Sequence, residues 1–571
     1  MLFLNIIITS STMTEVFKEP ASRYLLIGPS LLAFFLFLWP VGHSDLSKRE
    51  AREGVPVVHM DRGASLWVPR INDERVRTKP PLFYWAGLVA SKVLGGVSEI
   101  SLRLPSVFAG TATVFLTTLL GFRLFSPVTG CLAGLILATS WRYAYLASHA
   151  RIDMLFAFFI TLAFVGFWKM IKAEDDDKSR RTSLYVAVAL GLAILTKGPL
   201  GIIFPLMAWF IYSWRVGQKD IPWLRLIIVP LGIVGAWLAL AWTVGGEEFQ
   251  SMIYQETVGR VAGSGSIQIH HKPFYYYVPQ IFLGMAPWSL FLPVVLWSGF
   301  KKHRKDVQWL YPAMAWIALF VFLSLFSGKR GDYLLPLYPM AAIMIGHFFS
   351  ESLSDSSSRF SVGQLLPVWL LSGLIGVIAL VLFIPVLINI EPDIHLAFLN
   401  SRDRHMINLL LLHDLPSRRI LAMATVSMLF FALGLLVALK ERSFLKVWSF
   451  AAGWAIFVLL LAHGPVAKVI NGYSSLKPFA ERVKNKAPSR LVHMGEPRED
   501  LLYYLDRPVQ EAHEAKDVEN IIDNAETLLL VKGSQSGPLL EKYPHLRVIL
   551  ETKDMFRQHQ LLGPVSALAK H

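Results

Sequence analysis

Long apolar runs separated by short polar segments dominate the first 466 residues of the chain. A helix that crosses the hydrocarbon core of a membrane needs about 20 mostly apolar residues. The pattern predicts about thirteen spans, near residues 23–42, 104–122, 128–147, 153–171, 183–196, 199–214, 225–243, 274–298, 309–327, 333–350, 363–389, 419–438 and 446–463. The run at 80–96 is shorter and contains Lys92, so we expect an interfacial helix there.

The pattern changes after about residue 466, where the hydrophobic runs shorten to strand length. Three such runs are Arg490–Met494, Thr527–Lys532 and His545–Glu551. Polar stretches that suit helices, such as Asp517–Ala525, alternate with them. We therefore expect a cytoplasmic N-terminus over 1–22, a transmembrane domain over 23–466 and a small periplasmic α/β domain over 467–571.

The charges of the loops predict the orientation of the chain. Four short loops are basic, namely Lys172–Arg181, Arg215–Arg225, Lys301–Lys305 and Lys440–Lys446. The alternate loops at 43–102, 244–272 and 390–418 are long and mixed in charge. The positive-inside rule places the basic loops in the cytoplasm, and the long loops with the C-terminus outside. An apolar stretch precedes Met13 without a clear cleavage motif, so translation starts at Met1 or at Met13.

Composition agrees with a polytopic membrane protein. Hydrophobic residues make up 54% of the 571 residues and charged residues 17%, against roughly a quarter charged in soluble domains. Cys131 is the only cysteine, which excludes a disulfide scaffold. The formal net charge is +14, but the basic residues lie in short loops between spans. That distribution is typical of membrane topology and argues against a nucleic-acid partner.

Several cations lie on the outer side, where the positive-inside rule does not place them. They are Lys79, Lys197, Lys329 and Arg330, and the carboxylates Glu50, Glu53 and Asp153 accompany them. Lys79 precedes Pro80 and Pro81, which favour the start of a helix and hence an anion site beside its free amides. Cations near the membrane suit a lipid-linked phosphate, and carboxylates suit acid–base work.

The external loop at 244–272 ends in His270 and His271, followed by Lys272 and an aromatic run. These histidines either anchor the interface, contact a phosphate or bind a metal. Adjacent histidines are weak metal spacing, because no third ligand follows from the local sequence. The need for a divalent metal therefore stays open at this point.

Ordered motifs in this chain resemble the bacterial lipid A 4-amino-4-deoxy-L-arabinose transferases and their dolichyl-phosphate-mannose protein mannosyltransferase relatives. The resemblance covers roughly residues 20–350. It rests on Glu50–Glu53, Trp67–Asn72, Lys79–Trp85, Arg103–Ser106, Arg151–Met154, Leu195–Pro199, His271–Tyr277 and Tyr333–Pro339. The family architecture, with about thirteen spans, a large first external loop and a C-terminal periplasmic domain, agrees with the predicted topology.

The resemblance implies an inverting membrane glycosyltransferase of the GT-C type. Such enzymes move a hexose or pentose from a polyprenyl-phosphate carrier to an acceptor outside the cytoplasm. By the motifs, Lys79 and Lys197 contact the carrier phosphate, and His271 and Tyr333 lie near the sugar–phosphate junction. In the pocket that we expect, Arg52 and Arg330 also contact the phosphate. Asp153 positions an arginine or the acceptor, and a carboxylate of the first loop orients or deprotonates the acceptor.

The chain departs from the family pattern at two positions of the first loop. Family members commonly have an Asp-Glu pair where this chain has Arg49 and Glu50, so Glu50 is the expected catalytic carboxylate and Asp45 the alternative. Relatives have an acid before the Lys-Pro-Pro sequence that can share a metal with the later histidine. Here that position is Thr78, so the residues leave a metal undecided.

We therefore expect a glycosyltransferase in a bacterial inner membrane, with its active site facing the periplasm. The expected donor is a polyprenyl-phosphate sugar, and the acceptor is lipid A, another envelope glycan or a protein. A transporter or flippase of lipid-linked sugars is the alternative, but it needs a polar pathway that continues to the cytoplasmic side. The departure at Arg49 leaves a non-catalytic scaffold as a third hypothesis.

Overall fold

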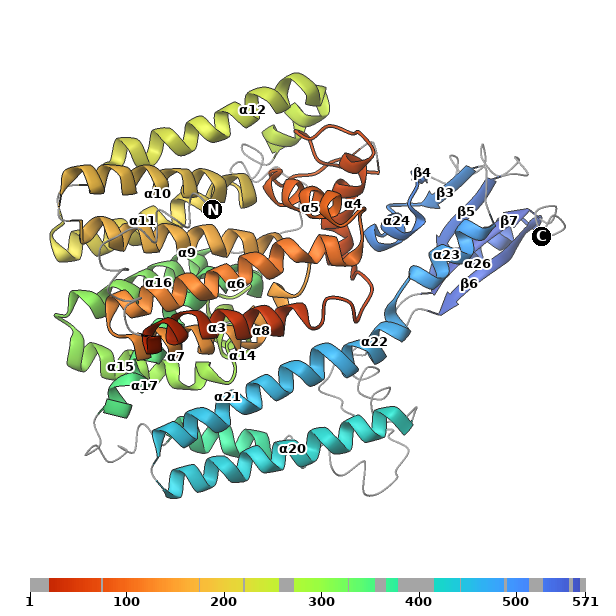
Figure 1. Cartoon of the computed structure of the whole chain (residues 1–571). Coiled ribbons are helices and arrows are strands. Elements are labelled where there is room, and N and C mark those ends of the chain that lie inside the picture. Colours follow the sequence, from red (N-terminus) through yellow and green to blue (C-terminus); the bar gives the residue numbers. More distant parts are fainter. Residues whose placement is uncertain are drawn as a thin grey trace.

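The computed structural model describes residues 20–72, 75–173, 175–218, 221–255, 272–326, 328–354, 366–377, 415–441, 443–486, 490–512, 527–553 and 558–564. These residues form a large bundle of helices, with a sheet at one end that belongs to the C-terminal part of the chain (Figure 1). The expected fold class, a polytopic helical protein with a C-terminal α/β region, is confirmed.

The helices of the bundle follow the predicted spans. They are α3 (Pro20–Leu38), α6 (Glu99–Leu124), α7 (Pro127–Ala138), α8 (Trp141–Ala147), α9 (Ile152–Ile171), α10 (Asp176–Lys197), α11 (Leu200–Val216), α12 (Trp223–Tyr254), α14 (Tyr277–Gly284), α15 (Leu292–His303), α16 (Val307–Leu325), α17 (Tyr338–Ser354), α20 (Leu415–Lys440) and α21 (Phe444–Leu461). A shorter apolar helix at Leu366–Val377 overlaps the predicted span at 363–389. Among the described residues, seven helices are long and apolar enough to cross a membrane, or eight if one bent pair counts. The number thirteen stays a prediction.

Two predicted spans are broken in the structure. The span predicted at 128–147 is two helices, α7 and α8, because α7 ends at Ala138 and Ser140 precedes the first turn of α8. The span predicted at 274–298 bends by 120° between Phe274–Gly284 and Trp288–His303. Both sides of each break are apolar, so hydropathy alone predicts one continuous helix.

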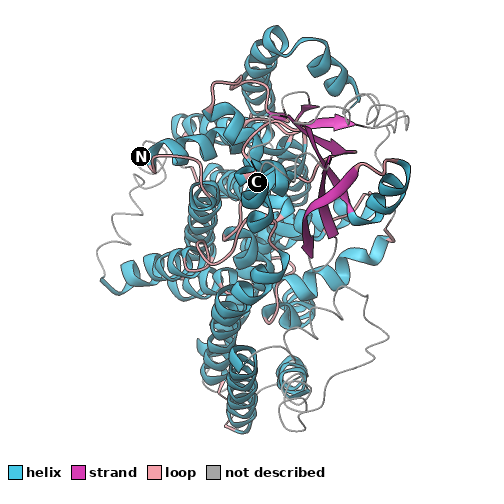
Figure 2. Ribbon diagram, turned by 90° about the vertical axis from the view of Figure 1, so that its right-hand side faces the viewer, coloured by secondary structure: helices cyan, strands magenta, loops and turns pink. Residues whose placement is uncertain are grey.

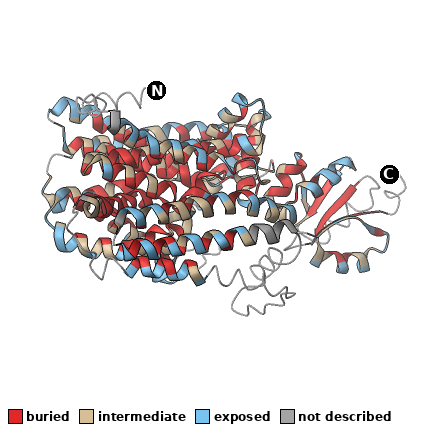
Figure 3. Ribbon diagram, turned by 60° about the horizontal axis from the view of Figure 1, so that its bottom comes forward, coloured by how far each residue is buried: buried red, intermediate tan, exposed pale blue. Residues whose placement is uncertain are grey.

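The outer faces of the bundle expose many large apolar side chains. Buried residues gather between the helices, whereas exposed residues lie along their outer faces (Figure 3). On α12 and α20, for example, Trp242 is 50% exposed and Phe430 is 61% exposed. Exposed apolar surface on this scale is typical of contact with lipid rather than with water.

The C-terminal part contains a five-stranded sheet of order β4-β3-β5-β7-β6 (Figure 2). Its strands are β3 (Arg490–Met494), β4 (Gln510–Ala512), β5 (Thr527–Lys532), β6 (Leu546–Lys553) and β7 (Gln558–Pro564). The three predicted strands are therefore confirmed to within two residues. The helices α23 (Lys477–Asn485), α24 (Glu499–Leu505) and α26 (Gly533–Lys542) accompany the sheet. The helix-compatible stretch at 517–525 lies outside the described residues.

The first long loop, predicted at 43–102, is folded and lies between the bundle and the C-terminal part (Figure 1). It contains α4 (Lys48–Asp61), a short hairpin of β1 (Arg70–Ile71) and β2 (Arg75–Val76), and α5 (Leu82–Val93). Helix α5 begins directly after Pro81, as the paired prolines predict. Its outer residues Val89 and Val93 are exposed, which suits the expected interfacial position.

The predicted domain boundary at residue 467 lies within continuous helix. Helix α21 passes through a π-helical turn, η5 (Ala462–Val466), into α22 (Ala467–Ser474). A turn of this type is where extra backbone is accommodated without ending the helix. The division at 466 and 467 therefore stays a prediction, although the sheet itself begins only at Arg490.

Candidate active site

Four charged side chains form a chain of ion pairs at one end of the bundle. The Lys197 Nζ atom lies 2.5 Å from an oxygen of Asp153, and Arg151 donates to the other Asp153 oxygen at 3.2 Å. Arg151 also donates to Asp332 at 2.7 Å. All four side chains are at least 84% buried, so water screens these contacts poorly.

Local structure explains how these side chains meet. Arg151 is the N-cap residue of α9, which places Asp153 in the first turn, where a carboxylate is favoured by the helix dipole. Lys197 is the last residue of α10, which ends at Gly198 with φ +84°. Asp332 and Tyr333 belong to the 3₁₀ turn η4 (Gly331–Leu337), which contacts α9.

Aromatic rings surround the Lys197 ammonium group. Its Nζ atom lies 4.5 Å from the centre of the Tyr333 ring and 5.1 Å from that of Phe156. Ring faces attract a cation at these distances. The sequence-predicted residues Asp153, Lys197 and Tyr333 are thus neighbours, and the lysine is held in place by a carboxylate and two rings.

The charge state of Arg151 follows from its two carboxylate partners. Burial alone would lower the pKa of its guanidinium, but Asp153 and Asp332 raise that pKa above its usual value. Arg151 therefore stays charged, and it fixes Asp332 relative to Asp153. Asp332 Oδ2 accepts the bond from Arg151, and Arg49 approaches the same oxygen at 4.0 Å.

Glu50, the expected catalytic carboxylate, is buried, and both of its oxygens accept hydrogen bonds. Its oxygens accept from Arg103 at 2.8 and 3.2 Å, from the Ser47 hydroxyl at 3.0 Å and from the Ala150 amide at 3.2 Å. Burial would raise the pKa of Glu50, but Arg103 and His149 lower it to about 2. Only 1% of the Glu50 surface is exposed and both of its oxygens accept hydrogen bonds, which argues for a structural role rather than the expected catalytic one.

The alternative carboxylate, Asp45, connects the first loop to the C-terminal part. It accepts bonds from Asn471 at 3.0 Å and Ser475 at 2.7 Å and pairs with Lys477 at 3.4 Å. Burial would raise the pKa of Asp45, but Ser475 and Asn471 lower it. This position also argues for a structural role rather than a catalytic one.

A second ion-pair group in the first loop lies close to Arg151. Glu53 accepts from Arg77 at 2.8 Å and from the Tyr84 hydroxyl at 2.9 Å, and it interacts electrostatically with Arg151. Burial and Glu53 both raise the pKa of Tyr84, so its hydroxyl stays protonated and donates. The sequence-predicted site does not include Arg77, because it lies in none of the motifs that carry the family resemblance.

The other predicted cations have different surroundings. Arg52 lies 3.9 Å from Glu499 of α24. It also interacts electrostatically with Arg330, whose side chain is exposed. Lys329 is buried and donates to the backbone carbonyls of Lys272 and Phe326, so it closes a turn. Lys79 is half-buried in the turn before α5. His270 and His271 lie outside the described residues.

Comparisons with known proteins agree with the motifs. A family model described as dolichyl-phosphate-mannose-protein mannosyltransferase matches residues 71–244. An uncharacterized protein of Aquifex aeolicus is 29% identical over 301 residues, which is 52% of this chain and 58% of that protein. The undecaprenyl phosphate-alpha-4-amino-4-deoxy-L-arabinose arabinosyl transferase of Enterobacter sp. (strain 638) is 26% identical over 337 residues, or 57% and 59% of the two chains. This chain thus spans somewhat less than two thirds of these relatives.

The crystal structure of ArnT from Cupriavidus metallidurans bound to undecaprenyl phosphate superposes with a TM-score of 0.75. The match covers 95% of this chain and 98% of ArnT, at 19% sequence identity. The chain has the GT-C fold of ArnT. The resemblance of its motifs to this family is confirmed. The prediction of a multi-pass bacterial membrane protein is confirmed as well.

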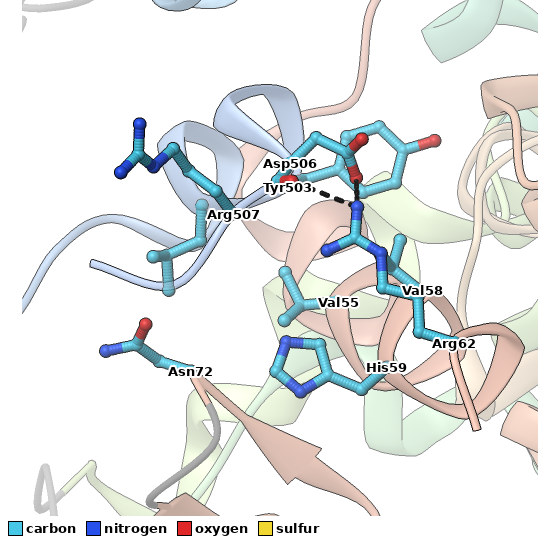
Figure 4. Close-up of a pocket in the computed structure, with 9 residues that line it drawn as sticks. Val55, Val58, His59, Arg62, Asn72, Tyr503, Asp506 and Arg507 are labelled. Atoms are coloured by element: carbon cyan, nitrogen blue, oxygen red, sulfur yellow. Dashed lines mark hydrogen bonds and ion pairs between the residues drawn. The ribbon is translucent and has the colours of Figure 1, made fainter. Parts of the chain in front are cut away.

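A small pocket in this ArnT-like fold lies between α4 and α24 (Figure 4). Val55 and His59 of α4, with Arg62 just after its end, face Tyr503 and Asp506 across it. Arg62 donates to the Asp506 carbonyl at 2.9 Å. The pocket lies at the contact surface between the first loop and the C-terminal part. None of the residues that line the pocket belongs to the ion-pair network of Lys197, Asp153, Arg151 and Asp332.

Proposed function

We propose that this chain is a glycosyltransferase that moves a sugar from a polyprenyl-phosphate carrier to lipid A or another acceptor of the cell envelope. The observation that carries the proposal is the chain of ion pairs from Lys197 through Asp153 and Arg151 to Asp332. It lies in a fold shared with ArnT, whose crystal structure contains undecaprenyl phosphate. The orientation predicted from loop charge puts this end of the bundle in the periplasm.

The reaction requires one bond to break and one to form at the anomeric carbon. An acceptor oxygen attacks this carbon while its bond to the carrier phosphate oxygen breaks, and the configuration inverts. The phosphate leaves with one more negative charge than it had in the donor. Cations held beside the leaving oxygen stabilise that charge and so lower the barrier.

Lys197 is the best-placed cation for the leaving phosphate. An ammonium group has three donors, and the bond to Asp153 uses one of them. Asp153 and the two aromatic rings hold the lysine in one position, which reduces the reorganisation needed during the reaction. The four buried charges of the network sum to zero, so the exposed Arg330 and Arg49 supply the net attraction for an anion.

Asp332 replaces Glu50 as the proposed acceptor-binding carboxylate. Among the described residues, Arg151 and Arg49 both approach its Oδ2 atom, so we assign the acceptor hydroxyl to Oδ1. A carboxylate in this position orients a hydroxyl acceptor and takes its proton. The bond from Arg151 at 2.7 Å fixes the direction of the Asp332 carboxylate.

The test of the phosphate site is sugar transfer by the purified full chain in lipid nanodiscs. A panel of undecaprenyl-phosphate sugars, including 4-amino-4-deoxy-L-arabinose, is supplied with lipid A, and products are identified by mass spectrometry. Lys197→Ala should reduce kcat about 100-fold or more. Lys172→Ala is the matched control, because it removes the same charge just beyond the opposite end of α9. Equal rates for wild type and Lys197→Ala, or carrier translocation without transfer, would overturn the proposal.

The same assay tests the acceptor carboxylate. Asp332→Asn keeps the shape of the side chain and removes its negative charge, so transfer to a hydroxyl acceptor should fall about 100-fold while donor binding persists. Donor binding is measured by competition with undecaprenyl phosphate. If Asp332→Asn transferred sugar normally and Glu50→Gln lost transfer without losing stability, Glu50 would regain the catalytic role.

A further inference from the structure

A cluster of two histidines and a carboxylate lies at the opposite end of the bundle from the candidate active site. His303 is the last residue of α15, and His347 and Glu351 lie four residues apart in the last turns of α17. From Tyr338 to Glu351 helix α17 rises roughly 20 Å. The cluster is therefore remote from Asp332 and Tyr333, which precede the start of α17.

The geometry of the three side chains suits a metal ion. One ligand atom of each residue lies within 4.8 Å of the others. A Glu351 oxygen is 3.1 Å from His303 Nε2 and 3.8 Å from His347 Nε2. Ligand atoms at about 2.0–2.2 Å from a tetrahedral zinc ion are themselves spaced by a little over 3 Å. Small side-chain rotations would bring all three within bonding distance of one ion.

The ion pair alone does not explain the cluster. His347 Nε2 is buried and has no hydrogen-bond partner among the described residues. Buried polar atoms normally have a partner, so an atom of this kind needs an explanation. The His347 ring stacks on Phe125 with centroids 3.8 Å apart, which holds its Nε2 atom toward His303 and Glu351.

We propose that His303, His347 and Glu351 bind a divalent transition-metal ion that joins the ends of α15 and α17. Two imidazoles and one carboxylate form the ligand set of zinc sites that keep a fourth position for water. Loop charge predicts the cytoplasmic side for this site, beside the basic segment Lys301–Lys305. The site is independent of sugar transfer, and its proposed effect is on the stability of the bundle.

The experiment measures zinc binding by the full chain in detergent. The protein is stripped with a chelator, dialysed and titrated with Zn²⁺ by calorimetry, and bound zinc is counted by elemental analysis. Each wild-type chain should bind one more zinc ion than a chain of His347→Gln or of Glu351→Gln. His545→Gln is the matched control, because that histidine is exposed in the C-terminal part. Bound Co²⁺ should give a visible absorption band that Glu351→Gln loses.

Thermal unfolding gives a second readout. Since an ion that binds only the folded state stabilises it by mass action, Tm of the wild type should rise with Zn²⁺ concentration, whereas that of His347→Gln should rise less. Equal zinc stoichiometry in wild type and both variants, or no zinc binding by the stripped wild type, would overturn the proposal. Sugar transfer is assayed in parallel. Its absence with zinc binding intact would contradict the proposed function and leave the metal site standing.

Discussion

Glu50 and Arg103 form the most buried ion pair of the described residues, with side-chain exposures of 2% and 1%. Arg103 also donates to the carbonyls of Val41, Ser44 and Asp45, so the pair fixes the chain between α3 and α4. Removing one member of such a pair leaves a charge buried without a partner, which typically costs about 3–5 kcal/mol. The role of Glu50 is therefore tested by stability rather than by rate.

Glu50→Gln should lower the Tm of the purified chain while leaving residual sugar transfer measurable at low temperature. In the wild type the folded-state pKa of Glu50 is about 2, below its ordinary value of 4.5. Its contribution to stability is therefore complete above about pH 4.5 and is lost as the pH falls toward 2. The variant should lack this part of the acid destabilisation. Unchanged Tm and pH dependence would contradict the structural role.

The sequence identifies the residue types of the site better than their pairings. Lys197, Asp153 and Tyr333 are ionisable or aromatic residues at predicted span ends, and the structure brings them together. Asp332 follows Lys329 and Arg330, and the positive-inside rule singles out only these two cations and not the carboxylate. Its pairing with Arg151 joins residues 181 positions apart, so it depends on how α9 and η4 pack. No local pattern contains that information.

At the level of elements, the turn from α10 to α11 decides where Lys197 lies. Gly198 adopts φ +84°, a conformation that residues with a side chain rarely adopt, and Pro199 precedes the first turn of α11. Gly201 then packs directly on α10, because an added Cβ atom would lie 2.5 Å from the backbone of Ala193 and Ile194. The helices approach so closely only because this residue is glycine.

Gly201→Ala should therefore push α11 away from α10 and displace Lys197. We expect a lower Tm together with a fall in sugar transfer of about tenfold or more, since backbone atoms cannot move aside as a flexible side chain could. Gly232→Ala is the matched control, because an added Cβ atom on α12 meets nothing within 4 Å. Both are measured by thermal unfolding and by the nanodisc assay. A Gly201→Ala variant as stable and active as Gly232→Ala would contradict this account of the turn.

Hydropathy predicts the positions of the helices well and their bends poorly. The predicted spans at 104–122, 153–171 and 309–327 match α6, α9 and α16, because a run of about 20 apolar residues suits little else. The bends at Ser140 and between Gly284 and Trp288 leave the hydropathy unchanged. The second break contains Pro287, which cannot donate a backbone hydrogen bond to a continuing helix, so proline positions indicate it where hydropathy does not.

At the level of the whole molecule, the C-terminal part holds the first loop in place. Lys48 and Arg52 of α4 pair with Glu499 of α24, at 3.5 and 3.9 Å. Gly54 of α4 leaves room for the Tyr503 ring. Because α4 also contains Glu53, the C-terminal part positions a group that interacts with Arg151. The sequence predicts the α/β region itself but not this connection, which joins residues more than 400 positions apart.

Asn72 joins the first loop to the C-terminal part through three hydrogen bonds of its side chain. Its side chain donates to the Val509 carbonyl at 2.8 Å and to Glu511 at 2.9 Å, and it accepts from the Val509 amide at 3.0 Å. The residue is 5% exposed and has φ +55°, which asparagine tolerates better than most residues. Its loss would leave two backbone groups of Val509 buried without partners, at a cost of about 1–3 kcal/mol each.

Asn72→Ala should thus loosen the first loop without unfolding the bundle. Hydrogen exchange of α4 and of the strand Gln510–Ala512 should become faster, while exchange of α9 and α16 stays unchanged. Sugar transfer should fall, because Glu53 loses a fixed position relative to Arg151. Gln510→Ala is the control, since that exposed side chain bonds to Arg490 of the same sheet. If exchange increased equally in α4 and α9, Asn72 would stabilise the whole fold. The inference that the C-terminal part fixes the first loop alone would then be wrong.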